Sequence, residues 1–493
     1  MKTIKYFILL ISSILLTGCS ESFFERYPFD ELNEQGFFDN ARNFEYSINA
    51  AYDNMRDVYG QLFYFDLASD DEYADKFNAA GAITYGAINE LDVMSDNSVI
   101  SNFWDNSYKA INRCNLVLDN IDKAEMDAEI RKRLKGEAFF LRSLLYFNMV
   151  RIFGGIPLVT KDLKTPEEAL AFGRSTVDQV YNDLIIPDLE RIITEQLLPT
   201  HYTENANIGR ATRYATHALL GKVYLTRHDY AKAKNHLKTV HDNPGIHTLL
   251  PDYADIFDAT NPNNPEILFA VQYASGLTRS GTSNMGNPYC TAAMPNEQTG
   301  QGLWETGGNG MYLMTYDLYR RFDLSDIRIN QIDTAWGSPT RPIYDKYVFT
   351  LKYRDKTNTT VKDSGNDWLV LRFADVLLMY AEVLAEDGDL AGAEAEVRAI
   401  RERAGLTTMP PMTTKAEAKQ AIADERRLEL FCEGHRWFDL LRTETVKEVM
   451  TAHFNGPWND YQIGANVKIE DSDLLFPLPK FEVDLNPDVL KQN

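Results

Sequence analysis

Basic residues are too few and too scattered for this chain to bind nucleic acid. Its 493 residues include 50 Lys and Arg against 72 Asp and Glu, so the formal net charge is −22. Proteins bind nucleic-acid phosphates mainly through clustered Lys and Arg, and the sequence contains no basic tract. We therefore exclude nucleic acid as a partner.

The sequence also lacks the usual signatures of metal centres and hydrolases. Its eight histidines form no His-Glu-x-x-His motif, and no cysteine pair has the spacing of zinc ligands. No Gly-x-Ser-x-Gly elbow occurs, and Ser364 lacks the preceding glycine of a serine-protease nucleophile, which favours a polar turn. We expect no metal, no cofactor and no catalytic residue, so the protein is predicted not to be an enzyme.

The first residues predict export and a lipid anchor. An apolar run from Tyr6 to Leu16 follows two lysines and is far shorter than the ~20 residues that a membrane-spanning helix needs. The string Leu-Thr-Gly-Cys at 16–19 resembles a bacterial lipoprotein signal, which implies cleavage after residue 18 and acylation of Cys19. Residues 1–18 are then a signal peptide, and 19–493 form a single domain. The alternative is an ordinary signal peptide with a chance cysteine.

Cysteine is too scarce for disulfide bonds to hold this exported chain together. Once Cys19 is assigned to lipid, an odd number of cysteines is left. These are Cys114, Cys290 and Cys432. We expect the first and last to be buried thiols in helices.

Helical periodicity predicts a mainly α fold. Amphipathic helices are expected from Asn43 to Tyr59 and from about Phe103 to Ile121. Residues 131–153 are apolar almost all round and predict a buried helix, which Gly154-Gly155 ends as a C-terminal cap rather than as a phosphate loop. We place the helical scaffold at about 41–60, 102–242 and 368–450.

Two segments match the tetratricopeptide pattern of paired helices. Gly221 and Ala233 are twelve residues apart and occupy the small positions of one repeat, and Ala381 and Ala393 occupy those of another. Small residues at these places let the paired helices approach closely. Two loop-rich segments, at about 61–101 and 243–367, interrupt the scaffold, and such loops commonly carry binding groups.

Several ordered segments resemble the SusD/RagB family of outer-membrane nutrient-binding lipoproteins. The resemblance covers essentially the whole chain after the signal. The segments are Leu134–Arg142 with Phe153–Leu158, Leu371–Glu382, Arg401–Leu406, Glu425–Leu430 with Glu433–Leu440, and Phe476–Pro479 with Asp484–Pro487.

The resemblance implies a fold, a location and a function. Members of the family have four tetratricopeptide-like helix pairs that support a loop-rich region. They are anchored on the outer face of the outer membrane and work with a TonB-dependent transporter, a SusC-like barrel. Most bind oligosaccharides and a minority bind peptides. A periplasmic repeat scaffold and an unrecognised hydrolase are the remaining alternatives.

Loop aromatics are the first candidates for ligand binding, because sugar rings pack against flat apolar faces. Trp304 is the strongest, since glycines at 300, 302, 307 and 308 leave little local bulk to bury an indole. Tyr73, Tyr289 and Tyr312 are the next candidates. Trp104, Trp368 and Trp437 are assigned to the helical framework instead.

Two clusters of charged residues are expected to differ in role. The first, Asp70-Asp71-Glu72, is read as a solvated loop, with a carbohydrate or ion contact through Asp71 as the alternative. The second lies on one predicted helix spanning Glu425 to Asp439, where carboxylates alternate with arginines. We expect scaffold ion pairs there, and we expect His435 to be an interior side chain.

Overall fold

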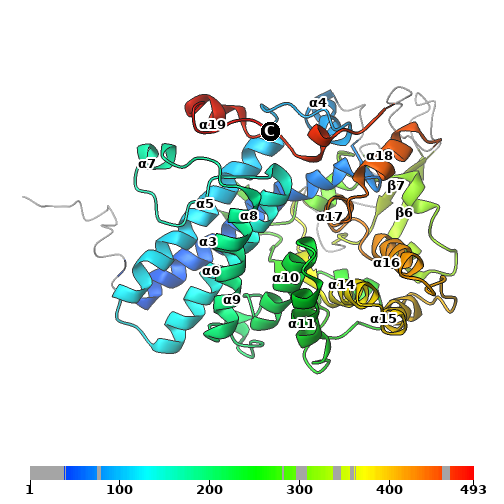
Figure 1. Cartoon of the computed structure of the whole chain (residues 1–493), viewed down its shortest axis with the longest axis horizontal. Helices are drawn as coiled ribbons and strands as arrows, with labels where there is room; N and C mark the ends of the chain where they lie inside the picture. Colours follow the sequence, from blue (N-terminus) through cyan, green and yellow to red (C-terminus); the bar gives the residue numbers. More distant parts are fainter. Residues whose placement is uncertain are drawn as a thin grey trace, which may run out of the picture.

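The computed structural model describes residues 38, 40–74, 79–279, 283–295, 308–336, 346–355, 360, 362–457 and 467–493. Two of the predicted functional residues, Cys19 and Trp304, lie outside these ranges. Helices dominate the described chain, and its short strands lie between and beside them (Figure 1). The mainly α prediction is confirmed.

Four pairs of packed helices form the scaffold. Helices α10 and α11 lie between the N-terminal and C-terminal pairs (Figure 1). The pairs are α3 (Ala41–Leu62) with α5 (Ser98–Asn120), α6 (Ala128–Phe153) with α9 (Ile186–Thr194), α10 (Arg213–Thr226) with α11 (Tyr230–His241), and α14 (Phe373–Glu386) with α15 (Leu390–Arg403).

Helix α6 begins and ends where its sequence dictates. The Asp127 carboxylate caps its first turn by accepting hydrogen bonds from the backbone N–H groups of Glu129 and Ile130. The helix is capped by Gly154. Its φ of +71° is a backbone conformation that favours glycine. The predicted C-terminal cap is confirmed.

The small residues of the tetratricopeptide pattern lie at helix contacts. A Cβ atom on Gly221 of α10 would lie 2.6 Å from the Leu237 side chain of α11, so a larger residue would push the helices apart. Ala233, Ala381 and Ala393 are completely buried. The predicted frame of the repeats is therefore confirmed.

The C-terminal helices differ from the prediction. Helix α16 (Lys415–Glu429) ends before Leu430, and α17 (Arg436–Arg442) starts after a turn that contains two residues with positive φ, Cys432 at 57° and Gly434 at 74°. The prediction of one continuous helix is wrong, because Cys432 in this conformation cannot continue an α-helix. A third helix, α18 (Val446–Asn455), follows.

The first loop-rich segment contains more regular structure than expected. A 3₁₀ helix (Phe63–Ala68), strand β1 (Glu72–Tyr73) and helix α4 (Ala79–Asn89) replace most of the predicted loop, and α5 already begins at Ser98. Because α4 combines small residues with two glycines, it has little intrinsic helix signal, and it packs against the 3₁₀ helix. Tertiary contacts therefore decide its conformation.

The second loop-rich segment is irregular, as predicted, and carries short strands. Strands β1, β5, β7 and β6 form one antiparallel sheet in the order β1-β5-β7-β6, and β2 pairs with β8. The remaining bounds are β2 (Ile267–Val271), β3 (Thr278–Arg279), β4 (Ser283–Asn284), β5 (Leu313–Met314), β6 (Ile332–Trp336), β7 (Lys346–Thr350), β8 (Trp368–Arg372), α7 (Pro166–Leu170), α8 (Val177–Gln179), α12 (Tyr289–Ala292), α13 (Tyr316–Tyr319) and α19 (Lys480–Leu485).

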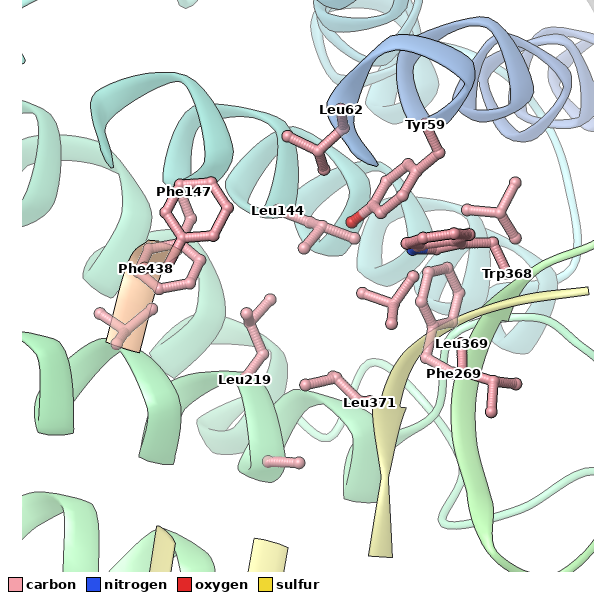
Figure 2. Packing of buried hydrophobic residues seen from close by; sticks show 14 of the residues in the cluster. Tyr59, Leu62, Leu144, Phe147, Leu219, Phe269, Trp368, Leu369, Leu371 and Phe438 are labelled. Carbon is pink, nitrogen blue, oxygen red and sulfur yellow. The ribbon is translucent and has the colours of Figure 1, made fainter. Parts of the chain in front are cut away.

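A large core joins the helix pairs to strands β2 and β8. Figure 2 shows side chains of α3, α6 and α10 meeting those of the two strands. Trp104 and Trp437 are buried on helices, as expected, whereas Trp368 is buried on strand β8 rather than on a helix. Cys114, Cys290 and Cys432 are free and buried. None of the described helices has the length and apolar character needed to cross a membrane.

Candidate functional site

The acidic segment after the 3₁₀ helix is buried and clamped to the C-terminal helices. Nε and Nη2 of Arg436 donate to the two carboxylate oxygens of Asp70 at 2.8 and 3.1 Å. Nη2 of Arg427 lies 2.9 Å from Oδ2 of Asp70, and Nε of the same arginine donates to the Asp71 carboxylate. The reading of this segment as a solvated loop is wrong, because both carboxylates are compensated by arginines more than 350 residues away.

Burial and these arginines set the protonation of the acidic cluster. Burial raises the pKa of Asp66 to about 7 and raises that of Glu72 well above its usual value. Burial acts in the same direction on Asp70, but Arg427 and Arg436 outweigh it and hold the pKa of Asp70 below its usual value. Asp71 is only 1% exposed, so its carboxylate has no free surface with which to contact a ligand.

A small sheet brings Tyr73 close to described residues that follow segment 296–307, the segment to which Trp304 belongs. Tyr73 on β1 pairs with Leu313 on β5. The described residues on either side of segment 296–307 are also joined, because Gly310 N donates to Met294 O at 2.8 Å and Tyr312 N donates to Ala292 O at 2.9 Å. The residues on both sides of the Trp304 segment are therefore fixed to each other and to the strand beside Tyr73.

Tyr73 retains an exposed part. Its side chain is half-buried and packs against a small apolar cluster that includes Leu313 and Phe349. Nearby on the chain, the ring centroids of Tyr64 and Tyr85 are 4.2 Å apart. Tyr85 is also half-buried.

Tyr289 and Tyr312 are core residues. They are 0% and 1% exposed, and their rings contact each other and Phe63 at centroid distances of 5.0 to 5.5 Å. A side chain without exposed surface has no face to offer to a sugar ring. We therefore remove both from the candidate set, because the aromatic cluster around Phe63 buries them.

The described residues line several pockets, two of which contain charged or aromatic side chains beside polar groups. One, of about 380 Å³, lies between α13, α16 and α18 and is lined mainly by charged side chains, Arg427 and Arg436 among them. The other, of about 220 Å³, combines Tyr52 and Phe269 with polar groups such as Gln272. Sequence reasoning missed the second pocket because Tyr52 lies on the amphipathic helix α3, where an aromatic residue predicts core packing.

The described residues contain no arrangement that indicates catalysis. Ser364 is fully buried, forms an isolated β-bridge with Asn287 rather than the predicted polar turn, and donates to the Asn366 side chain at 2.6 Å, so its hydroxyl makes a structural contact. His435 is an interior side chain, and burial lowers its pKa to about 3. Within the part of the chain that the structure describes, no three His, Cys, Asp or Glu side chains are placed to hold a metal ion.

Family models match both halves of the chain. The model described as SusD family matches residues 330–493, and one described as starch-binding associating with outer membrane matches residues 26–225. A curated relative, SusD-like protein P2 of Formosa agariphila, is 26% identical over an alignment of 520 residues that covers 99% of this chain and 99% of the relative.

Solved structures share the whole architecture. A laminarin binding SusD-like protein superposes with a TM-score of 0.75 at 26% identity, over 92% of this chain and 98% of that chain. The surface glycan-binding protein A of Bacteroides thetaiotaomicron, in complex with laminarihexaose, superposes with a TM-score of 0.78 over 92% of this chain and 99% of that one. Its identity of 22% makes this second likeness one of fold alone.

Proposed function

Since the chain belongs to the SusD family of glycan-binding proteins, we propose that it is a cell-surface lipoprotein that binds an oligosaccharide and delivers it to a TonB-dependent transporter in the outer membrane. Acylation of Cys19 would provide the anchor. A SusC-like barrel would be the receiving partner. The protein would bind its ligand without cleaving it.

The observation that supports this proposal best is that strand β1, which ends at Tyr73, pairs with strand β5, which follows segment 296–307 in the chain. Backbone hydrogen bonds join residues on both sides of segment 296–307, and strand β5 continues from them to pair with β1. A glycine is required at the end of the segment, because a Cβ on Gly308 would lie 2.1 Å from Met294 O. Such fixed loop ends would hold an aromatic platform in place and lower the entropy cost of binding.

Laminarin oligosaccharides are the first ligands to test. A SusD-like protein that is 26% identical to this chain is described as laminarin binding. Half-exposed Tyr73 and the predicted platform Trp304 would supply flat apolar faces for the C–H groups of glucose rings. We therefore propose a neutral glucan as the ligand class.

Calorimetry with laminarihexaose tests the proposal. The wild type should bind, and Trp304→Ala should lose about thirtyfold in affinity, because aromatic hot spots typically contribute 2 kcal/mol or more. Phe481→Ala is the matched control: Phe481 is 69% exposed on α19, so its loss should leave binding unchanged. Trp437→Ala should instead lower stability by about 3 to 5 kcal/mol, because its indole is fully buried.

Other outcomes distinguish the alternatives. Binding to another glycan, lost again in Trp304→Ala, would keep the function and change only the sugar. Binding to peptides but to no member of a glycan panel would replace the ligand class. Normal binding by Trp304→Ala would show that the site lies elsewhere, with Tyr73 and the pocket beside Tyr52 as the next positions to change.

A further inference from the structure

The pocket of about 380 Å³ between α13, α16 and α18 lies against the buried ion pairs of Asp70. Asp70 and Arg427 are both buried and both line it, with Nη2 of the arginine 2.9 Å from the carboxylate. Strand β1, which ends at Tyr73, begins two residues after Asp70. The pocket therefore has one wall that the ion pairs hold in place, and it lies close to the strand that carries Tyr73.

Opposite charges balance around this pocket. Its lining contains four guanidinium groups and four carboxylates, which belong to Arg320, Arg321, Arg427, Arg436, Asp70, Asp317, Asp424 and Glu448. Burial lowers the pKa of His453, which also lines the pocket, so this imidazole is neutral near neutral pH. The lining groups as a set therefore call for neither an anion nor a cation.

Two carboxylates of the pocket have oxygens that can accept further hydrogen bonds. Glu448 on α18 is exposed and forms no hydrogen bond or ion pair within the described chain. Asp424 on α16 is also exposed. Its Oδ1 accepts from Nε2 of Gln420 at 3.0 Å, whereas its Oδ2 has no partner among the described residues. These oxygens are available to a ligand that donates hydrogen bonds.

Arg321 on α13 supplies hydrogen-bond donors to the same pocket. Its side chain is 42% exposed, and its Nε and Nη2 contact the Asp317 carboxylate at 3.1 and 3.0 Å. Arg427 donates to the same carboxylate at 3.2 Å. The Nη1 group of Arg321 has no acceptor in the part of the chain that the structure describes. The pocket therefore offers donors as well as acceptors.

We propose that this pocket is a subsite for one uncharged sugar residue of the bound oligosaccharide, an inference that rests on the proposed glycan function. A sugar hydroxyl both donates and accepts hydrogen bonds, so a site for it must present acceptors and donors together. Asp424 and Glu448 present the acceptors, and Arg321 presents the donors. An acidic or a basic sugar would add an uncompensated charge to a balanced set of groups.

The size of the pocket and the rest of its lining fit this ligand. Its volume lies within the range of about 300 to 1,000 Å³ that is usual for small-molecule sites. Val449 and Ala452 of α18 add apolar surface for the C–H groups of a sugar ring. Because the ion pairs of Asp70 hold one wall in place before a ligand arrives, binding does not have to order that wall.

Calorimetry tests the subsite with laminarihexaose, or with the glycan of the panel that the wild type binds. Glu448→Ala and Asp424→Ala should each weaken binding by about tenfold, the usual effect of losing a hydrogen bond to a charged group. Both side chains are exposed and form no ion pair within the described chain, so both variants should keep the wild-type melting temperature. Glu402→Ala is the matched control. Glu402 is an exposed carboxylate on α15 that does not line the pocket, so its loss should leave the affinity unchanged.

The salt dependence of binding tests the charge of the ligand. An uncharged sugar should bind with the same affinity at low and at high sodium chloride, because salt screens interactions between charges. A steep loss of affinity at high salt would show that the pocket takes a charged group, and it would overturn the proposal.

The remaining outcomes separate this subsite from the proposed function. Wild-type affinity in both Glu448→Ala and Asp424→Ala would overturn the subsite and leave the glycan function standing. Failure of the wild type to bind any glycan of the panel would overturn both. A crystal structure with the oligosaccharide bound should show a sugar ring in the pocket, and a glycan bound elsewhere with only water in the pocket would overturn the subsite alone.

Discussion

Asp70 and Arg436 form a two-point ion pair across 366 residues of chain, with Nε and Nη2 of the arginine 2.8 and 3.1 Å from the two carboxylate oxygens. The pair attaches the first loop-rich segment to helix α17. Arg427 on α16 reinforces it from a second side, 2.9 Å from the same carboxylate. The strand that carries Tyr73 starts two residues later, so this clamp fixes one edge of the candidate ligand site.

Asp70→Asn should strongly destabilise the fold. The change leaves buried Arg427 and partly buried Arg436 without their full counter-charge, and removal of one partner of a buried pair typically costs about 3 to 5 kcal/mol. Denaturant unfolding measures the loss. Asp484→Asn is the control, because Asp484 forms an exposed pair with Lys480 and should change stability by less than about 1 kcal/mol. Equal losses in the two variants would show that the clamp does not stabilise the protein.

Asp66 should make stability fall between about pH 4 and pH 7. Burial raises its folded-state pKa to about 7, so in this window the folded state holds a proton that the unfolded state has released. Stability is therefore greatest below the unfolded pKa and decreases as the pH rises to 7. Asp66→Asn should flatten this dependence, because an amide oxygen can still accept from Trp437 N. Identical pH profiles of the two proteins would rule out this assignment.

Ala233→Leu and Ala381→Leu should each lower stability by about 1 to 3 kcal/mol. Both alanines are completely buried at contacts between paired helices, where added methyl groups overpack the interface. Ala231→Leu, at an exposed position two residues away on α11, should have little effect. Thermal melts of the three variants decide the point. An unchanged melting temperature for Ala233→Leu and Ala381→Leu would mean that these contacts can expand without strain.

Cys19→Ala should prevent lipidation and release the protein from the membrane fraction. Metabolic labelling with a fatty-acid analogue measures acylation, and cell fractionation measures anchoring. Cys290→Ala is the control, because Cys290 is a buried free thiol that should not carry lipid. Continued labelling of Cys19→Ala would exclude Cys19 as the lipidated residue.

The sequence by itself determined the long helices of the scaffold, because their signals are local. Helical periodicity placed α3, α5 and α6, and Gly154 marked the end of α6 through a backbone conformation that favours glycine. The twelve-residue spacing of Gly221 and Ala233 identified a close helix contact, since both residues belong to one helix pair. Each of these signals depends on residues that are near one another in the chain.

Only the tertiary structure decided which loop residues are buried. Asp70 and Asp71 have the composition of a solvated loop, and their partners Arg427 and Arg436 are too distant in sequence for any local pattern to reveal. The sequence likewise predicts that Tyr289 is an exposed aromatic residue of a loop. In the structure, the rings of Phe63 and Trp368 pack against it and bury it. Burial is a property of the assembled chain, because it depends on surfaces contributed by segments hundreds of residues apart.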